Sequence, residues 1–258
     1  MKRELLFAFA AFFFLSSSVL TGAYAVEESK EMTSLSEKQM DLTGDGKAET
    51  IHLKGKRFED GADYLRDILI EIKEHDGKQY TINLDGGYEP HVEFADINHD
   101  GIAELFVSIP TGGSGGLSHF HLYTLQDSKL TNLPVPDPLV IQSQFLDHYK
   151  GKITIDLTKK SYEFNLKNRA RAYEELGLYQ EGKLSEPTEL MVHAFHSLKP
   201  INCKEERLCL RGVQRISGAS NADSIAFVES TWLYDKSKWM LVDTKVMQMK
   251  HKKHRRKG

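Results

Sequence analysis

The sequence predicts an all-β protein with a minor α part. We expect hairpin repeats resembling the blades of a β-propeller, followed by a β-rich C-terminal region. Apolar and polar residues alternate in several short segments, which is the period of a half-buried strand. Asp-Gly and Gly-rich turns separate these segments. An Asp-rich loop occurs at residues 41–49 and again at residues 96–104, and such repetition indicates an array of similar units.

The first residues are typical of a secretory signal peptide. Lys2 and Arg3 precede an apolar run, and Ala23-Tyr24-Ala25 fits an A-x-A cleavage site. The run is short for a membrane span, and no later stretch approaches ~20 apolar residues. We therefore expect residues 1–25 to be cleaved and no transmembrane segment. The mature protein is expected to be bacterial and either secreted to the extracellular space or associated with the cell envelope.

The first repeat follows the loop at residues 41–49. Ile51 and Leu53 predict a short strand directly after it. Residues 67–84 contain two alternating apolar runs on either side of Asp76-Gly77, which predicts a β-hairpin. The strand that leads into the second loop completes about four strands, the content of a propeller blade.

The second repeat, which starts near residue 96, continues through two strands joined by the GGSGG segment. A degenerate third copy starts near residue 147, where the turn is kept and the oxygen ligands are lost. We therefore expect a repeat region at residues 26–165 and a β-rich region at residues 166–249. Ala, Glu and Leu favour one short helix at residues 168–179.

Each Asp-rich loop offers the oxygen ligands that calcium prefers. Side chains at loop positions 1, 3, 5 and 9 and the carbonyl at position 7 would form most of a shell, and Gly at position 6 permits the turn. The expected ligands in the second loop are Asp96, Asn98, Asp100, the Ile102 carbonyl and Glu104. Those in the first loop are Asp41, Thr43, Asp45, the Lys47 carbonyl and Glu49.

These loops do not fit an EF-hand, which needs Glu at position 12 and flanking helices. Position 12 is His52 in one loop and Val107 in the other, and strand patterns flank both. We expect a structural calcium clip with an affinity of about 10⁻⁴–10⁻³ M. The first loop should be the weaker one, because Thr43 is a poorer ligand than Asn and Gly44 loosens the turn. The alternative is a plain hairpin turn, in which Asp and Asn bond their own backbone.

The segments DLTGDGKAETIHL and DINHDGIAELFV resemble FG-GAP and VCBS-type repeats. These calcium-bearing hairpin units are found in integrin α-subunit propellers and in many bacterial surface proteins. The resemblance covers about residues 36–165, although the FG and GAP dipeptides are not evident. It implies blade-like hairpins and a role in adhesion, ligand binding or scaffolding. A closed propeller needs about four blades, and about two and a half are visible, so we expect an incomplete array.

Charge and cysteine content limit the partners. A net charge of −3 gives no reason to expect a nucleic-acid partner. Residues 250–258 are strongly basic and form either a solvated tail or a contact with an anionic envelope polymer. Export favours a disulfide between Cys203 and Cys209, with free thiols or a metal site as alternatives.

Two features raise the question of catalysis. His119 and His121 would point to one face of a strand, and His91 is near in sequence, so a zinc site is conceivable beside plain surface histidines. Ser114 in GGSGG lacks the G-x-S-x-G spacing of hydrolases. We therefore predict a non-catalytic binding or structural module of the cell envelope, with an unknown protein or carbohydrate ligand. The alternative is a secreted metal-dependent hydrolase at the three histidines.

Overall fold

The computed structural model describes residues 32–203 and 207–249. Antiparallel strands dominate this part of the chain, which also contains one short α-helix, α2 (Ala170–Glu175). This confirms the predicted all-β class with a minor α part. No helix in the described residues is long and apolar enough to cross a membrane. The predicted signal peptide and the basic tail at residues 250–258 lie outside the described residues.

The first sheet is an antiparallel meander whose first two strands are joined by the first Asp-rich loop. Its order is β1-β2-β3-β4, with β5 paired to β3. The strands are β1 (Thr33–Met40), β2 (Glu49–Arg57), β3 (Tyr64–Lys73), β4 (Gln79–Leu84) and β5 (Gly87–Tyr88). The predicted hairpin across Asp76-Gly77 is confirmed, because β3 pairs with β4 and Gly77 adopts a left-handed φ of +93°.

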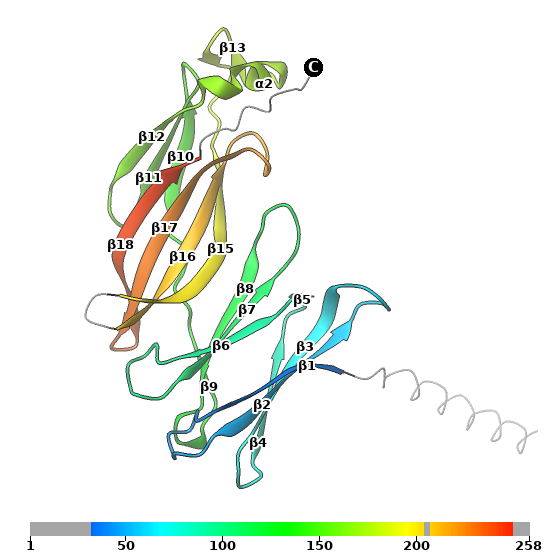
Figure 1. The fold of residues 1–258 in the computed structure, drawn as a ribbon. Coiled ribbons are helices and arrows are strands. Elements are labelled where there is room, and N and C mark those ends of the chain that lie inside the picture. Colours follow the sequence, from blue (N-terminus) through cyan, green and yellow to red (C-terminus); the bar gives the residue numbers. More distant parts are fainter. Residues whose placement is uncertain (1–31, 204–206, 250–258) are drawn as a thin grey trace, which may run out of the picture.

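The second sheet repeats this layout around the second loop. Its order is β6-β7-β8-β9. The strands are β6 (His91–Ala95), β7 (Glu104–Pro110), β8 (Ser118–Thr124) and β9 (Thr131–Leu133). The first strand of each meander enters an Asp-rich loop and returns as the second strand (Figure 1). A short 3-10 turn, η1 (Gln126–Ser128), lies between β8 and β9.

The second sheet is a middle layer, as the two faces of β7 show. Leu105, Val107 and Ile109 point into a core shared with the first sheet. Phe106, on the opposite face, joins a core shared with the C-terminal part of the chain. A strand buried on both faces reads as a continuous apolar run, which is what Leu105, Phe106 and Val107 show.

The C-terminal part contains a three-stranded sheet, a small hairpin and a four-stranded sheet. The three-stranded sheet consists of β10 (Ile141–Leu146), β11 (Lys150–Ile155) and β12 (Ser161–Asn165). The small hairpin pairs β13 (Tyr179–Gln180) with β14 (Lys183–Leu184), and a 3-10 turn, η2 (Lys167–Arg169), precedes α2. The four-stranded sheet consists of β15 (Met191–Asn202), β16 (Leu208–Ser217), β17 (Ser224–Asp235) and β18 (Lys238–Gln248).

These sheets share one core, so the predicted boundary at residue 165 falls inside a packed unit. Leu139, Ile153 and Phe164 pack in the same cluster as Ile216 and Val228. Buried Gln214 reinforces this packing, because its side chain bonds both backbone groups of Leu139, the N–H at 2.7 Å and the carbonyl at 3.1 Å. The boundary between the two halves therefore lies just before Leu139.

The third hairpin, β10–β11, differs from the two Asp-rich hairpins in its connection. Leu146 pairs with Lys150, which leaves a three-residue turn in which His148 and Tyr149 are left-handed. Asp147, the residue matched to Asp96, accepts a hydrogen bond from the Leu184 N–H at 3.0 Å. In this hairpin the aspartate anchors β14 to the turn.

The GGSGG segment joins the two halves. Arg215 on β16 donates hydrogen bonds to the carbonyls of Ser114 and Gly115, at 2.7 and 2.9 Å. A ring nitrogen of His196 on β15 lies 2.7 Å from the Gly116 carbonyl. Figure 1 shows this loop, at the tip of the β7–β8 hairpin, reaching up beside β15. The glycines let the backbone approach the C-terminal sheet closely.

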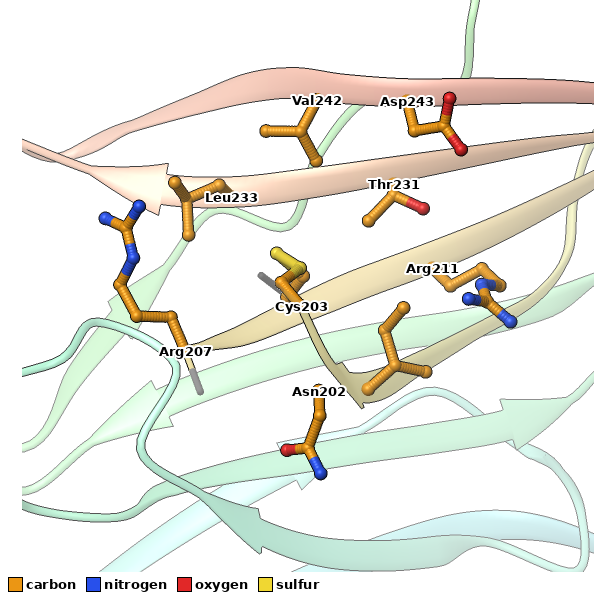
Figure 2. A pocket seen from close by; sticks show the side chains of 10 residues that line it. Asn202, Cys203, Arg207, Arg211, Thr231, Leu233, Val242 and Asp243 are labelled. Atoms are coloured by element: carbon orange, nitrogen blue, oxygen red, sulfur yellow. A yellow bond between two sulfur atoms is a disulfide. The ribbon is translucent and has the colours of Figure 1, made fainter. Parts of the chain in front are cut away.

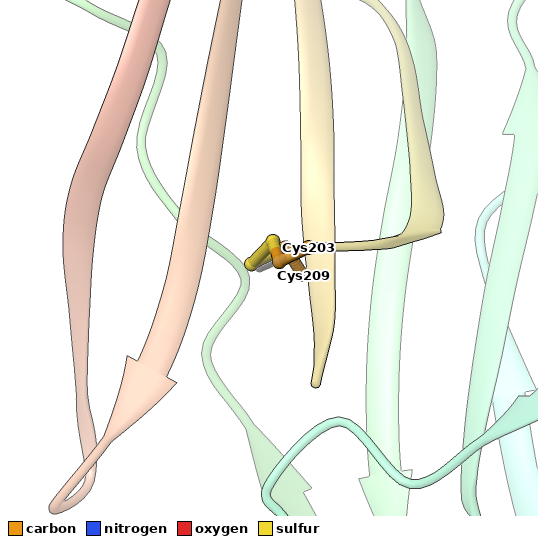
Figure 3. The surroundings of a disulfide bond; sticks show 2 residues. All are labelled: Cys203 and Cys209. Atoms are coloured by element: carbon orange, nitrogen blue, oxygen red, sulfur yellow. A yellow bond between two sulfur atoms is a disulfide. The ribbon is translucent and has the colours of Figure 1, made fainter. Parts of the chain in front are cut away.

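The predicted disulfide between Cys203 and Cys209 is confirmed (Figure 3). The two Cα atoms lie 5.7 Å apart, within the usual range for a disulfide. Asn202 pairs with Leu208, so the bond closes the tip of the β15–β16 hairpin.

Candidate functional site

The two Asp-rich loops share one backbone conformation. Gly44 and His99, at position 4 of their loops, have φ of +80° and +65°. Gly46 and Gly101, at position 6, have φ of +84° and +89°. Met40 pairs with Glu49, and Ala95 with Glu104, so each loop closes an antiparallel hairpin. The expectation of a strand–loop–strand unit is confirmed, and flanking strands exclude an EF-hand.

The aspartate at position 1 organises each turn. Asp41 accepts hydrogen bonds from the backbone N–H groups of Gly44 and Gly46, at 2.8 and 2.9 Å. Asp96 accepts from Asp100 and Gly101, both at 3.1 Å, so the two loops share the donor at position 6 and differ in the other one, which is at position 4 in the first loop and position 5 in the second. In these bonds the side-chain carboxylate accepts from backbone N–H groups, as it does in an ordinary Asx turn.

The aspartate at position 5 accepts a hydrogen bond from the backbone N–H at position 7. The N–H of Lys47 donates to Asp45 at 2.8 Å, and that of Ile102 donates to Asp100 at 2.9 Å. Lys47 and Ile102 are the residues whose carbonyls were predicted to ligate calcium. Their N–H groups are thus fixed by the loop, which also fixes the peptide planes on that side of the turn.

The glutamate at position 9 closes each loop from inside. Glu49 and Glu104 are both 0% exposed. Oε2 of Glu49 accepts the N–H groups of Leu42 and Thr43, at 2.7 and 3.2 Å. Oε2 of Glu104 accepts those of Ile97 and Asn98, at 2.8 and 3.1 Å. A carboxylate is buried at the same place in both loops because the backbone supplies two donors there.

The second glutamate oxygen distinguishes the loops. In the first loop the Thr43 hydroxyl donates to Oε1 of Glu49 at 3.4 Å. In the second loop the residue at position 3 is Asn98, and its amide donates instead to Asp100 at 2.9 Å. Oε1 of Glu104 is buried and has no hydrogen-bond partner in the structure. An unpaired buried carboxylate oxygen is costly, which makes it a candidate ligand atom.

Electrostatics add to this cost in the second loop. Burial raises the pKa of Glu104 to about 7, against the lowering effect of the Asn98 and Ile97 N–H groups. The nearby carboxylates of Asp100 and Asp96 raise this pKa further. A cation in the loop would oppose both effects, because it favours the ionised carboxylate.

The first loop shows the tighter gathering of carboxylates. Ligand oxygens of Asp41, Asp45 and Glu49 lie within 4.8 Å of one another. Within the described residues this is the one group of at least three His, Cys, Asp or Glu side chains that meets this distance. His75 lies beside it, with Nδ1 3.6 Å from Asp45 and Nε2 2.7 Å from the Lys47 ammonium. The carboxylates of the second loop do not converge to the same extent.

The two loops lie next to each other. A Cβ placed on Gly44 would stand 2.6 Å from Cδ1 of Ile102, at position 7 of the second loop. The Thr43 carbonyl also accepts the N–H of Asp127 at 3.3 Å, which ties the first loop to the turn after β8. Gly44 therefore permits a close approach and a left-handed backbone, where the sequence suggested a loosened turn.

The three histidines of the hydrolase hypothesis do not form a metal cluster. His91 is on β6 and the others are on β8, and none belongs to the single described group with metal-ligand distances. His119 lies 4.0 Å from Asp85. Burial lowers the pKa of His121, whose Nε2 has no partner in the structure.

Ser114 is also engaged elsewhere, since its hydroxyl accepts the Asn221 side-chain amide at 3.0 Å. Its partners Arg215 and Asn221 come from the opposite half of the molecule. Sequence reasoning missed them, because no local pattern marks contacts across about a hundred residues of chain.

Comparisons with known proteins concern mainly the C-terminal half. Residues 139–247 match a family model described as YybI C-terminal domain, which coincides with the shared core that begins at Leu139. The chain is also similar to Uncharacterized protein YybI of Bacillus subtilis (strain 168). That relative is 26% identical over 208 residues, which cover 78% of this chain and 79% of the relative. No solved structure matches the chain.

Proposed function

We propose that this protein is a non-catalytic binding or structural module of the bacterial cell envelope, with calcium-stabilised hairpin loops. The observation that supports it best is Oε1 of Glu104, a buried carboxylate oxygen with no partner at position 9 of a loop rich in oxygen ligands. The converging oxygens of Asp41, Asp45 and Glu49 support the same role for the first loop.

The donor set fits calcium by its chemistry. It consists of carboxylate, amide, hydroxyl and carbonyl oxygens, with no sulfur and no imidazole at the predicted ligand positions. A bound calcium ion would supply the positive charge that lets several carboxylates share one loop. The two left-handed positions and the backbone bonds to Asp41 and Asp96 hold each turn in shape before any ion arrives.

The remaining parts of the proposal concern architecture and location. The two antiparallel sheets that each contain an Asp-rich hairpin support the proposal of blade-like units, which the resemblance to VCBS-type repeats implies. Export is supported by the signal-like first 25 residues and by the Cys203–Cys209 disulfide, since disulfides persist in oxidising compartments. A surface protein or carbohydrate is the proposed ligand class, with residues 250–258 as a contact for an anionic envelope polymer.

Calcium titration of the chelator-treated protein tests the proposal. We expect saturable heat in calorimetry, and a melting temperature raised by about 3–6 °C at ten times the dissociation constant. Asp96→Ala/Asp100→Ala should remove the binding of the second loop. Asp60→Ala/Asp63→Ala, which removes two carboxylates outside the loops, is the matched control and should bind like the wild type. Absence of both heat and thermal shift in the wild type would make both loops plain hairpin turns.

A further inference from the structure

A hollow of about 750 Å³ lies on the outer face of the sheet β15–β18, at the end where the Cys203–Cys209 disulfide closes the β15–β16 hairpin (Figure 2). This volume is within the range of small-molecule sites. On the opposite face of the same strands, Leu210 and Trp232 are buried in the protein core. The hollow therefore belongs to the solvent side of a sheet whose other side holds the two halves together.

A β-bulge shapes one side of the hollow. Thr231 pairs with Asp243, but the next residue, Trp232, pairs with Leu241, so Val242 is an extra residue on β18. A bulge breaks the alternation of a strand and re-aims side chains. Val242 and Asp243 are consecutive, yet both are exposed and both line the hollow. An apolar and an acidic side chain are thereby presented together.

Opposite charges stand across the hollow in one row. Arg211, Thr231 and Asp243 are in register on the neighbouring strands β16, β17 and β18. No hydrogen bond or ion pair joins the side chain of Arg211 or Asp243 to another residue in the described part of the chain. Two strand spacings separate them, which is about 10 Å between their backbones. Both charges are thus available to a ligand.

The rest of the hollow is lined by apolar and polar side chains, among them Leu233, Asn202 and Arg207. Cys209 and Leu233 lie beside the charged row, two residues from Arg211 and Thr231 toward the tip of the β15–β16 hairpin, and are 0% and 6% exposed. The disulfide from Cys209 to Cys203 fixes the end of the β15–β16 hairpin, which forms one wall. A site that is fixed in advance loses less entropy when a ligand binds.

We propose that this hollow binds a short zwitterionic peptide in an extended conformation. The Arg211 guanidinium would pair with the terminal carboxylate, for which its planar fork is suited. Asp243 would pair with the terminal ammonium, and Leu233 and Val242 would contact an apolar central side chain. An extended tripeptide is about 10 Å long, which matches the separation of the two backbones that carry Arg211 and Asp243. None of the residues that line the hollow is a predicted calcium ligand, so the proposal does not rest on calcium.

The test uses the tripeptide Ala-Val-Ala as the probe and calorimetry as the readout, in calcium and again in chelator. We expect saturable binding in both buffers. Amidation of the peptide carboxylate and acetylation of its amine should each weaken binding at least tenfold. Arg211→Ala should weaken binding of the free peptide to the same extent and should not further weaken binding of the amidated peptide. Lys245→Ala, which removes a charge on the same sheet face outside the hollow, should leave affinity unchanged.

Three results would overturn the proposal. The first is no saturable binding of Ala-Val-Ala to the wild type. The second is equal affinity for the free and doubly blocked peptides, because binding would then depend on apolar contact and not on the two charges. The third is loss on amidation without loss on acetylation, which would make the hollow an anion site. The blocked peptides are measured on the wild type, so the conclusion does not depend on how the variants fold.

Discussion

The two Asp-rich loops are nearly identical in backbone and differ in how they satisfy one buried carboxylate. In both, a fully buried glutamate accepts the N–H groups of positions 2 and 3. In the first loop the Thr43 hydroxyl also bonds the second oxygen of Glu49, whereas Oε1 of Glu104 has no partner. The side chain at position 3 therefore decides whether the loop is complete by itself.

This difference changes which of the two loops we expect to depend more on a bound cation. From the sequence, Thr43 was the poorer ligand, because a hydroxyl is a weaker cation ligand than an amide oxygen. In the structure Thr43 points inward and is a partner of Glu49, while Asn98 points toward Asp100. The first loop brings its carboxylates together, and the second loop leaves an oxygen unpaired. We expect the second loop to depend more on a cation for its stability.

The largest expected effect is the pH dependence of the second loop without calcium. The pKa of Glu104 is about 7 in the folded protein and has an ordinary value of 4.5. A raised folded pKa means that this group's contribution is fully present below pH 4.5 and is lost as pH rises through 7. The loss amounts to about 3 kcal/mol. Urea unfolding of chelated protein at pH 4.5, 6 and 8 measures it, and Glu104→Gln should flatten the difference. If the free energy of unfolding changed equally with pH in the wild type and in Glu104→Gln, the prediction would be contradicted.

The second effect concerns the first loop. Glu49→Ala removes the acceptor of two backbone N–H groups and of the Thr43 hydroxyl. We expect a loss of about 2–3 kcal/mol, because buried donors would be left without partners. Glu104→Ala should cost less in chelator at pH 8, because the variant also relieves the burial of a charge. Urea unfolding of both variants at that pH tests the order, and the reverse order would refute the comparison.

The third effect concerns the left-handed residue at position 4. Gly44→Ala adds a Cβ at a φ of +80° and 2.6 Å from Ile102, and should destabilise by about 1–2 kcal/mol. The matched change His99→Gly should stabilise by about 0.5–1 kcal/mol, because His99 holds a φ of +65° at a cost that glycine avoids. Thermal melts of both variants should shift in opposite directions. A shift in the same direction would mean that the loops do not share this conformation in solution.

The smallest expected effect comes from exchanging the side chains at position 3, which tests directly whether this residue supplies the partner of the buried glutamate. Asn98→Thr would give the second loop the hydroxyl that the first loop has, and so a partner for Oε1 of Glu104. We expect chelated protein to gain about 1 kcal/mol, the usual net value of one hydrogen bond. The stabilisation by calcium should shrink by a similar amount. Thr43→Asn is the reciprocal variant and should have the opposite effect on stability. If both variants changed stability equally, the residue at position 3 would not be the cause of the difference between the loops.

Much of the fold could be predicted from the sequence, because it depends on short-range patterns. Alternating apolar residues specified the strands around Asp76-Gly77, and the Asp-rich repeat specified two hairpins with the same turn. The disulfide followed from two cysteines near the tip of one hairpin. Each of these features involves residues close in the chain, where period, turn chemistry and spacing limit the choices.

The domain boundary and the charged hollow were decided by tertiary structure. The core that begins at Leu139 joins strands separated by many residues, so the predicted boundary at residue 165 missed it. Arg211 and Asp243 are brought into one row by the strand between them, and a single bulge at Val242 sets the direction of the acidic side chain. A bulge leaves no periodic signal in one sequence, because one extra residue looks like an ordinary strand position.

The sequence by itself determined which residues form the two loops and that their oxygens could serve a cation. Only the tertiary structure decided which oxygens already have partners. That outcome depends on whether a side chain at position 3 turns inward or along the loop, and on the burial of Glu49 and Glu104 beneath neighbouring sheets. Burial converts a small difference in side-chain direction into a large difference in free energy, because an unpaired carboxylate oxygen has no water to replace its partner.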